Sequence, residues 1–314
     1  KLTKLKEKIY FTDKKGKGGG VGYAVKKQGD ATVVLVGPPS VGKSTLLNQL
    51  TNAKSKIAPY DFTTVTVIPG MMEYKDAKIQ ILDVPGLIEG AEEGRGRGKE
   101  VLSVARGADL IIIMCDVERI KRFEKMINSL EKVGIRINQI PPNINIEKRV
   151  KGGLIIHSNI IQDLRKETVE EVANELGIKN AEITIKEKLS LENLIDAFLP
   201  NRIYVPAIFI INKIDLNIPL QKKLDTVYQP ISASTGFGLD KLKEKIWEKL
   251  GFIRIYLIKQ DEKPTLNHPM IVKSGDNLGR ITEKIGSEFA EEKKLAKIWG
   301  PGSKYPGQEV SLTT

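Results

Sequence analysis

The stretch ATVVLVGPPSVGKSTLLNQLTNA, residues 31–53, decides the fold class. It opens with a β-branched apolar run that ends in glycine, and from residue 43 onward its apolar residues recur at helical spacing. Between these parts, GPPSVGKS at 37–44 fits the pattern G-x-x-x-x-G-K-[ST], whose glycines let successive backbone N–H groups face phosphate oxygens. A strand, this loop and a helix in that order predict a phosphate-binding loop.

The residues of this loop have expected roles. Lys43 would contact the β- and γ-phosphates and assist catalysis, and the Ser44 hydroxyl would bind Mg²⁺. The N-terminus of the following helix adds a positive dipole that favours an anion. The expected nucleotide contacts in this part of the chain are Gly37, Pro38, Pro39, Ser40, Val41, Gly42, Lys43, Ser44 and Thr45.

A second motif, NKID at 212–215, follows the apolar run AIFII and indicates which base is bound. Asp215 would accept two hydrogen bonds from the ring N–H and amino group of guanine, whereas adenine offers no such pair of donors. Asn212 would hold the base and the phosphate loop, and the stem of Lys213 would cover the base. The expected contacts to the guanine oxygen come from SAS, that is Ser232, Ala233 and Ser234.

A third motif, DVPG at 83–86, would sense the terminal phosphate. Asp83 would hold a Mg²⁺-bound water, and the Gly86 N–H would contact the γ-phosphate as a catalytic group. Thr64 would add a second hydroxyl to Mg²⁺ and assist catalysis; the alternative is that Thr63, Thr64 and Thr66 are only strand formers. The remaining expected nucleotide contacts are Phe62, Thr63, Thr64, Asp83, Val84, Pro85 and Gly86.

The charge and cysteine content restrict the class of protein. The net charge is +11, and lysines crowd the first 30 residues around the glycine-rich GKGGGVG. This pattern favours a mobile basic arm that contacts nucleic acid or another polyanion, with a solvated lysine-rich surface as the alternative. The single Cys115 lies in the short apolar run at 109–115, so we expect a core residue in a cytoplasmic protein without a membrane segment.

The motifs together resemble one known group of proteins. GPPSVGKSTLL, DFTTVTVIPG, DVPGLIEGAEEGRGRG, NKID and SAS are similar to those of the Obg superfamily of GTPases, above all the archaeal and eukaryotic developmentally regulated GTP-binding proteins. The resemblance covers nearly the whole chain. It implies GTP and GDP with Mg²⁺ as ligands, and it leaves K⁺ open, because Ser40 stands where potassium-using relatives often have asparagine. It also implies association with ribosomes or structured RNA and with a small stabilising partner protein; we expect no oligomer and no membrane contact.

The domain organisation follows from the alternation of patterns. Buried runs separated by helical segments predict a GTPase domain, with a mostly parallel sheet and helices on both faces, over 31–140 and 202–250. An inserted small α/β module is expected over 141–201, where PPNINIEKRV and GGLIIHSN indicate a β pair and two helices follow. Residues 1–30 would be the basic arm. Residues 251–314 resemble the C-terminal TGS domain of the family, a β-grasp module, and one more strand would be expected after VSLTT.

The motifs do not indicate which residue positions the attacking water. Leu87 stands where many nucleotide hydrolases keep a water-positioning glutamine, and an apolar side chain cannot orient water. We therefore expect slow intrinsic GTP hydrolysis, accelerated when a partner or the ribosome orders residues 87–99. Arg95 and Arg97, flanked by glycines, are candidate charge stabilisers; phosphate or RNA contacts and plain exposed charges are the alternatives. A different class of function is an RNA-binding or assembly module that uses the guanine nucleotide mainly as a structural ligand.

Overall fold

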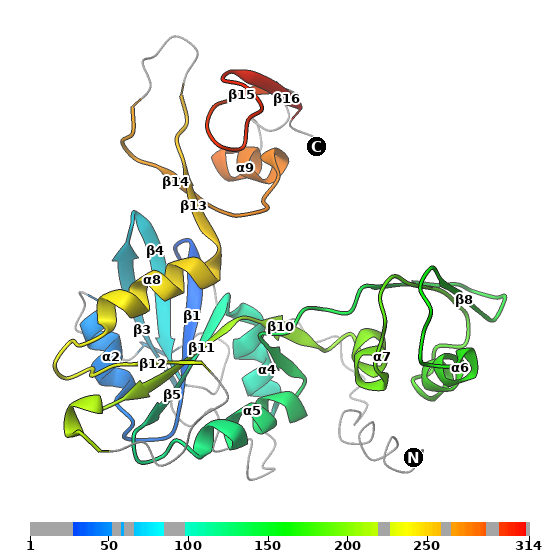
Figure 1. Ribbon diagram of the computed structural model, residues 1–314, viewed down its shortest axis with the longest axis horizontal. Helices are drawn as coiled ribbons and strands as arrows, with labels where there is room; N and C mark the ends of the chain where they lie inside the picture. Colours follow the sequence, from blue (N-terminus) through cyan, green and yellow to red (C-terminus); the bar gives the residue numbers. More distant parts are fainter. Residues whose placement is uncertain are drawn as a thin grey trace.

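The computed structural model describes residues 28–51, 58–59, 66–84, 98–218, 227–258, 265–286 and 295–311 (Figure 1). Within these ranges the chain is a mixed α/β protein. A central sheet is covered by helices on both faces, a smaller sheet with its own helices lies between residues 144 and 198, and strand pairs follow toward the C-terminus. No helix in these ranges combines the length and the apolar character needed to cross a bilayer.

The central sheet, as far as the chain is described, has seven strands in the order β12–β11–β5–β1–β4–β3–β2. Neighbours from β12 to β4 are parallel, whereas β3 is antiparallel to β4 and β2 to β3. The predicted mostly parallel sheet is therefore confirmed, and the antiparallel strands β3 and β4 follow one another as a hairpin. The strands are β1 (Ala31–Val36), β2 (Ala58–Pro59), β3 (Thr66–Tyr74), β4 (Ala77–Asp83), β5 (Leu110–Asp116), β11 (Ala207–Asn212) and β12 (Tyr228–Pro230).

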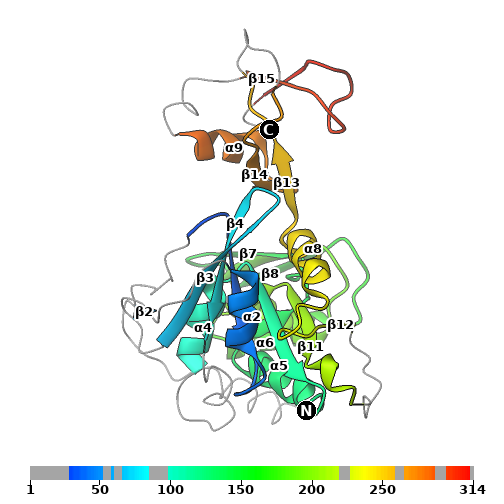
Figure 2. The ribbon, with the colours of Figure 1, turned by 90° about the vertical axis from the view of Figure 1, so that its left-hand side faces the viewer.

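Both faces of the sheet are buried, which explains why its strands read as continuous apolar runs. Successive side chains of β1 point to opposite faces: Val34 and Val36 belong to one core cluster, and Val33 and Leu35 to the other. The first cluster packs against α4 (Gly98–Gly107) and α5 (Arg122–Lys132), and the second against α2 (Lys43–Leu50) and α8 (Leu239–Leu250). Figure 2 looks onto the second face, with α2 in front of the sheet.

The segment between β5 and β11 leaves the central domain and returns to it. It leaves through β6 (Ile135–Ile137) and comes back through β10 (Ile203–Val205), and these two strands pair in parallel. Between them, β7 (Ile144–Lys148), β8 (Leu154–Ser158) and β9 (Ala181–Ile185) form a three-stranded sheet, packed against α6 (Lys166–Glu175) and α7 (Leu191–Phe198). We call residues 144–198 the inserted module.

The expected pairing of the first two strands of the module is wrong. Strands β7 and β8 do not pair with each other; β9 lies between them, antiparallel to β7 and parallel to β8. The reason is burial, because the alternate residues Ala181, Ile183 and Ile185 of β9 are almost completely buried while β7 and β8 are only half covered. The most buried strand takes the centre of the sheet.

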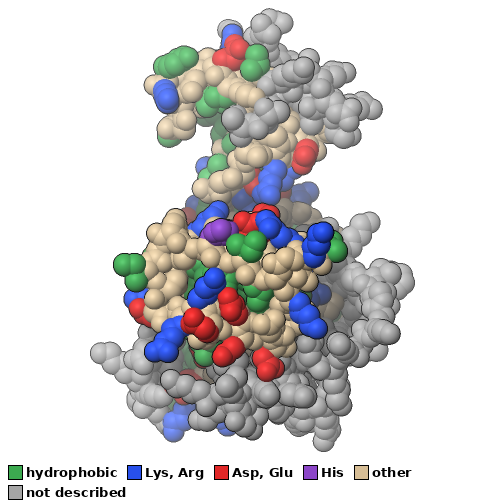
Figure 3. All heavy atoms as spheres, turned by 90° about the vertical axis from the view of Figure 1, so that its right-hand side faces the viewer, with side chains coloured by type: hydrophobic (Ala, Val, Ile, Leu, Met, Phe, Trp, Pro, Cys, Tyr) green, Lys and Arg blue, Asp and Glu red, His purple; other side chains and the backbone are tan. Residues whose placement is uncertain are grey.

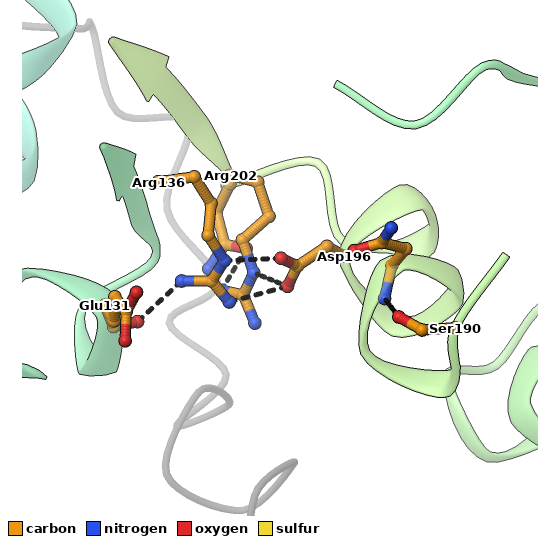
Figure 4. A network of polar contacts seen from close by, with 7 residues as sticks. Glu131, Arg136, Ser190, Asp196 and Arg202 are labelled. Carbon is orange, nitrogen blue, oxygen red and sulfur yellow. Dashed lines mark hydrogen bonds and ion pairs between the residues drawn. The ribbon is translucent and has the colours of Figure 1, made fainter. Parts of the chain in front are cut away.

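An ion-pair cluster joins the inserted module to the strands that lead into and out of it (Figure 4). Asp196 of α7 accepts hydrogen bonds from Arg136 Nε at 2.5 Å and Nη2 at 2.7 Å, and from Arg202 Nε at 2.7 Å. Arg136 also donates to the backbone oxygen of Glu131 at 2.8 Å. We call Arg136, Asp196 and Arg202 the clasp, because it ties α7 to both β6 and the residue before β10.

The C-terminal part begins inside the core of the central domain. Phe252 and Ile271 belong to the same cluster as α8, and Trp247 makes edge-to-face contacts with Tyr74 and Phe252. The elements are β13 (Phe252–Ile255), β14 (Met270–Lys273), α9 (Leu278–Ile285), β15 (Leu295–Ile298) and β16 (Gln308–Ser311). Among the described residues, β13–β14 and β15–β16 form two separate antiparallel pairs. The assignment of a TGS domain stays a prediction.

Candidate nucleotide site

The phosphate loop is shaped by two glycines that admit no side chain. A Cβ on Gly37 would lie 2.4 Å from the backbone oxygen of Met114, so β1 can end beside β5 only with glycine there. Gly42 has a φ of +97°, and a Cβ on it would lie 2.4 Å from Asn212 Nδ2. The loop is thus pressed against the ends of two neighbouring strands. It passes directly into α2, which begins at Lys43.

The side chain of Lys43 lies inside this loop. It is 8% exposed, and its Nζ donates to the backbone oxygens of Gly37 at 2.8 Å and Pro38 at 3.0 Å. These acceptors are neutral, and charge-assisted hydrogen bonds to an anion are stronger. A phosphate oxygen entering the loop can therefore draw the ammonium away from the two carbonyls.

Ser44 and Asp83 form the corner of the site where a cation fits. Ser44, exposed on the first turn of α2, donates from Oγ to Asp83 Oδ2 at 2.8 Å. Asp83 ends β4 and is 1% exposed, and its Oδ1 has no hydrogen-bond partner among the described residues. A buried carboxylate oxygen without a partner is costly and calls for a donor or a cation. Hard oxygen ligands of this kind suit Mg²⁺, which keeps several of its waters, so the residues present fit the metal.

Asn212 connects the phosphate loop to the predicted base-binding segments. It ends β11 and is 3% exposed. Its Nδ2 donates to the backbone oxygen of Val41 at 2.9 Å, and its Oδ1 accepts from the Ala233 N–H at 2.8 Å. One buried amide therefore fixes the loop of residues 37–44 against the SAS segment, as its two-sided chemistry allows.

The residues expected to read the base lie around Asp215. Lys213 has a φ of +63°, which turns the chain into the short 3₁₀ helix Ile214–Leu216. Asp215 is exposed on that turn, and Ser234 Oγ lies 3.5 Å from its Oδ2, at the limit of a hydrogen bond. Ser234 in turn lies 3.0 Å from Ser232 Oγ. The exposed carboxylate and the serines thus face one another across one small region.

These groups share one edge because the strands that carry them are parallel. The phosphate loop follows β1, and Asp83, Asp116 and Asn212 end β4, β5 and β11. The carboxyl ends of parallel strands meet at one edge of the sheet, where ligands of open α/β folds bind. Val84, buried beside Asp83, lies at the same edge. The predicted residues Phe62, Thr63, Thr64, Pro85, Gly86, Arg95 and Arg97 lie outside the described residues, as does Leu87.

The structure adds two residues that the motifs did not indicate. Asp116 is fully buried at the end of β5 and pairs with Lys213, and Arg119 pairs with Asp116 and also contacts Pro39. In the sequence, the only sign of Asp116 was a charged residue at the end of the apolar strand β5, Leu110–Asp116. Next to it, burial and then the charge of Asp116 raise the pKa of the Cys115 thiol to about 12. Cys115 is thus a core residue whose thiol stays protonated at neutral pH.

Comparison with known proteins assigns the chain to known families. Residues 32–148 match the family described as 50S ribosome-binding GTPase, and residues 151–252 match the C-terminal region of that domain. An uncharacterized GTP-binding protein of Methanocaldococcus jannaschii is 45% identical over 300 residues, which cover 93% of this chain and 77% of the relative.

Eukaryotic relatives are similar over almost the whole chain. Developmentally-regulated GTP-binding protein 1 of Xenopus laevis is 41% identical over 320 residues, 99% of this chain and 86% of the relative. Developmentally-regulated G-protein 3 of Arabidopsis thaliana is 41% identical over 319 residues, with the same two shares. These similarities include the segments that carry the loop, the DVPG motif and NKID.

Proposed function

Because this chain belongs to the family of developmentally regulated GTP-binding proteins and is a P-loop GTPase, we propose that it acts as a slow GTP-hydrolysing switch linked to the ribosome or to structured RNA. The observation that carries the proposal is the convergence of the phosphate loop, Asp83 and NKID at one edge of a parallel sheet. Each motif is short, and their meeting in space supports a single nucleotide site.

The phosphate side of the proposal rests on Lys43, Ser44 and Asp83. Lys43 leaves the carbonyls of Gly37 and Pro38 to bind the β- and γ-phosphates of GTP. Ser44 and Asp83 would hold Mg²⁺, which would offset negative charge on the phosphates. The protein's own contribution is positioning, which is the main requirement of phosphoryl transfer.

The base side of the proposal rests on Asp215. Its carboxylate is exposed and stands close to the SAS segment, where an incoming base can accept a backbone N–H. Guanine offers a ring N–H and an amino group to such a carboxylate, and adenine does not. The chain therefore binds GTP and GDP in preference to ATP.

The partner part of the proposal rests on charge and on the missing glutamine. The net charge of +11 and the lysines of residues 1–27 suit phosphate contacts. Leu87 leaves the attacking water to be positioned by a group that arrives with the partner or lies in residues 87–99. The side of the molecule shown in Figure 3 carries both acidic and basic side chains. Within the inserted module, Arg149 pairs with Glu182 and Lys188 pairs with Asp163.

Single-turnover GTP hydrolysis by the full chain tests this function. The rate should be slow alone and should rise on adding ribosomes, with measurements in Na⁺ and in K⁺ to settle the monovalent cation. Arg95→Ala and Arg97→Ala should reduce the stimulated rate, since an arginine in that position is worth about 10³–10⁵. A fast rate that ribosomes and both substitutions leave unchanged contradicts the proposal.

A second experiment separates a switch from a protein that uses the nucleotide as a structural ligand. Binding to ribosomes or structured RNA is compared with GTP, with GDP and without nucleotide. A switch must bind its partner with different affinity in these states. Equal affinity in the GTP-bound, GDP-bound and nucleotide-free states would favour the RNA-binding or assembly function. Leu87 and the basic N-terminal sequence support that alternative.

A further inference from the structure

A buried carboxylate outside the sequence motifs pairs with two basic side chains at the edge of the nucleotide site. Asp116 is fully buried, and its Oδ2 lies 3.2 Å from Lys213 Nζ and 3.1 Å from Arg119 Nη2. Its Oδ1 accepts the backbone N–H of Arg119 at 3.1 Å. A buried ion is stable only when it is paired and hydrogen-bonded in this way. The Asp116 carboxylate therefore holds both Lys213 and Arg119 in place.

Arg119 extends this contact to the phosphate loop. Its Nη1 donates to the backbone oxygen of Pro39 at 2.7 Å, while Nη2 of the same guanidinium pairs with Asp116. The planar fork of arginine can bind a carbonyl and a carboxylate at once with little loss of freedom. A continuous path thus runs from Pro39 through Arg119 and Asp116 to Lys213. It is separate from the path through Asn212, which ends on Val41.

The Pro39 contact has a consequence for the next residue. In a planar trans peptide, the carbonyl of one residue and the N–H of the next point in opposite directions. By holding the Pro39 oxygen, Arg119 fixes the direction of the Ser40 N–H, a predicted phosphate donor. Ser40 has a φ of +59°, which is disfavoured for a residue with a side chain and requires outside support.

We propose that Arg119 and Asp116 are positioning residues for the guanine nucleotide. Asp116 pairs with the ammonium group of Lys213 and so fixes the stem of Lys213 where the base binds. Arg119 binds the Pro39 oxygen and so keeps the Ser40 N–H in the direction of the phosphates. Neither touches the nucleotide, and both act through residues that do. This inference rests on the proposed GTP-binding function, and it adds to that function a link between the base and phosphate halves of the site.

Nucleotide affinity of variants of the 314-residue chain tests the inference. Calorimetry with GDP and with GTP, both with Mg²⁺, should show Arg119→Ala binding each nucleotide about tenfold more weakly, the loss of one charge-assisted hydrogen bond. The matched control is Arg122→Ala, which removes an exposed arginine nearby on α5. Arg119→Lys keeps the charge beside Asp116 but lacks the forked guanidinium. Its nucleotide affinity should lie between those of Arg119→Ala and Arg122→Ala.

Kinetics separate positioning from catalysis. In Arg119→Ala the GTP concentration for half-maximal hydrolysis should rise about tenfold, while the saturating rate falls less than about threefold. Asp116→Asn should also raise the GTP concentration for half-maximal hydrolysis. In the double variant of Arg119→Ala and Asp116→Asn, this concentration should rise by less than the product of the two single increases. If Asp116→Asn does not fold, the comparison of Arg119→Ala with Arg119→Lys carries the test.

Three outcomes overturn the inference. Affinity of Arg119→Ala equal to that of the Arg122→Ala control shows that the Pro39 contact does not support binding. A saturating rate that falls tenfold at unchanged affinity would make Arg119 a catalytic residue instead. A wild-type chain that binds neither GDP nor GTP refutes the proposed function itself, and the inference with it, so the two failures are distinguishable.

Discussion

The clasp offers a stability prediction that the structure makes quantitative. The substitution is Asp196→Asn, which keeps the shape of the side chain and removes its charge. Asp196 is 7% exposed and receives three hydrogen bonds from Arg136 and Arg202, whose side chains are 15% and 8% exposed. The variant leaves two nearly buried guanidiniums around a neutral amide that can accept only part of their hydrogen bonds.

The size of the effect follows from burial. Removing one partner of a buried ion pair costs about 3–5 kcal/mol, because the remaining charge is left without compensation. The retained amide oxygen places Asp196→Asn near the lower end, at about 3 kcal/mol. The inserted module also supplies a matched control, since Lys188 and Asp163 form a pair with side chains 59% and 75% exposed. Asp163→Asn should cost less than about 1 kcal/mol.

Hydrogen exchange is the suitable assay, because unfolding of a chain with several domains need not be two-state. Amides of α7, β6 and β10 should lose protection in Asp196→Asn and keep it in Asp163→Asn. GDP affinity should stay within about threefold of wild type, since β11 is held between β5 and β12 in the central sheet. Equal protection in the two variants would refute the idea that the clasp fixes the inserted module.

Three further predictions concern the nucleotide site and the core. Asp215→Asn should lower GTP affinity by about 10² relative to ATP, the value of the lost charged hydrogen bonds, as competition binding will show. Ser44→Ala should raise the Mg²⁺ concentration for half-maximal GTP hydrolysis by about tenfold, measured by Mg²⁺ titration. Because the pKa of Cys115 is raised from 9.0 to about 12, the unfolded chain ionises first as pH rises. The contribution of Cys115 to the free energy of unfolding should therefore decrease as the pH rises from 9.0 to about 12, by about 1.4 kcal/mol per pH unit. Urea unfolding of the wild type and of Cys115→Ala across this pH range measures the decrease.

Much of the fold could be predicted because its signals are local. The strand, loop and helix of residues 31–53 are adjacent in sequence, and the strands buried on both faces read as continuous apolar runs. The order of strands in the inserted module could not be read in the same way. AEITI at 181–185 is a short alternating segment, and only its burial between two half-exposed strands makes it the central one.

The same distinction separates the predicted and the missed site residues. Asn212 belongs to a four-residue motif, so its role could be expected before its contact with Val41 was known. Arg119 and Pro39 are 80 residues apart, and their contact exists only because β5 lies beside β1 in the sheet. A sequence pattern cannot encode a pair of that separation without knowledge of strand order. The pairing of Asp116 with Lys213, across 97 residues, is hidden for the same reason.

The two paths to the phosphate loop also explain how a loop with two prolines can bind phosphate. Pro38 and Pro39 have no N–H, so the first backbone donor of the loop after Gly37 is that of Ser40. The peptide units that precede Ser40 and Gly42 have their carbonyls held by Arg119 and Asn212. Because each N–H points opposite to the carbonyl of its own peptide unit, these two side chains set the direction of two remaining donors. Loss of the Arg119 or the Asn212 side chain should then lower the affinity for nucleotide more than the rate of the chemical step. The reason is that fixed donors contribute binding energy to both GTP and GDP.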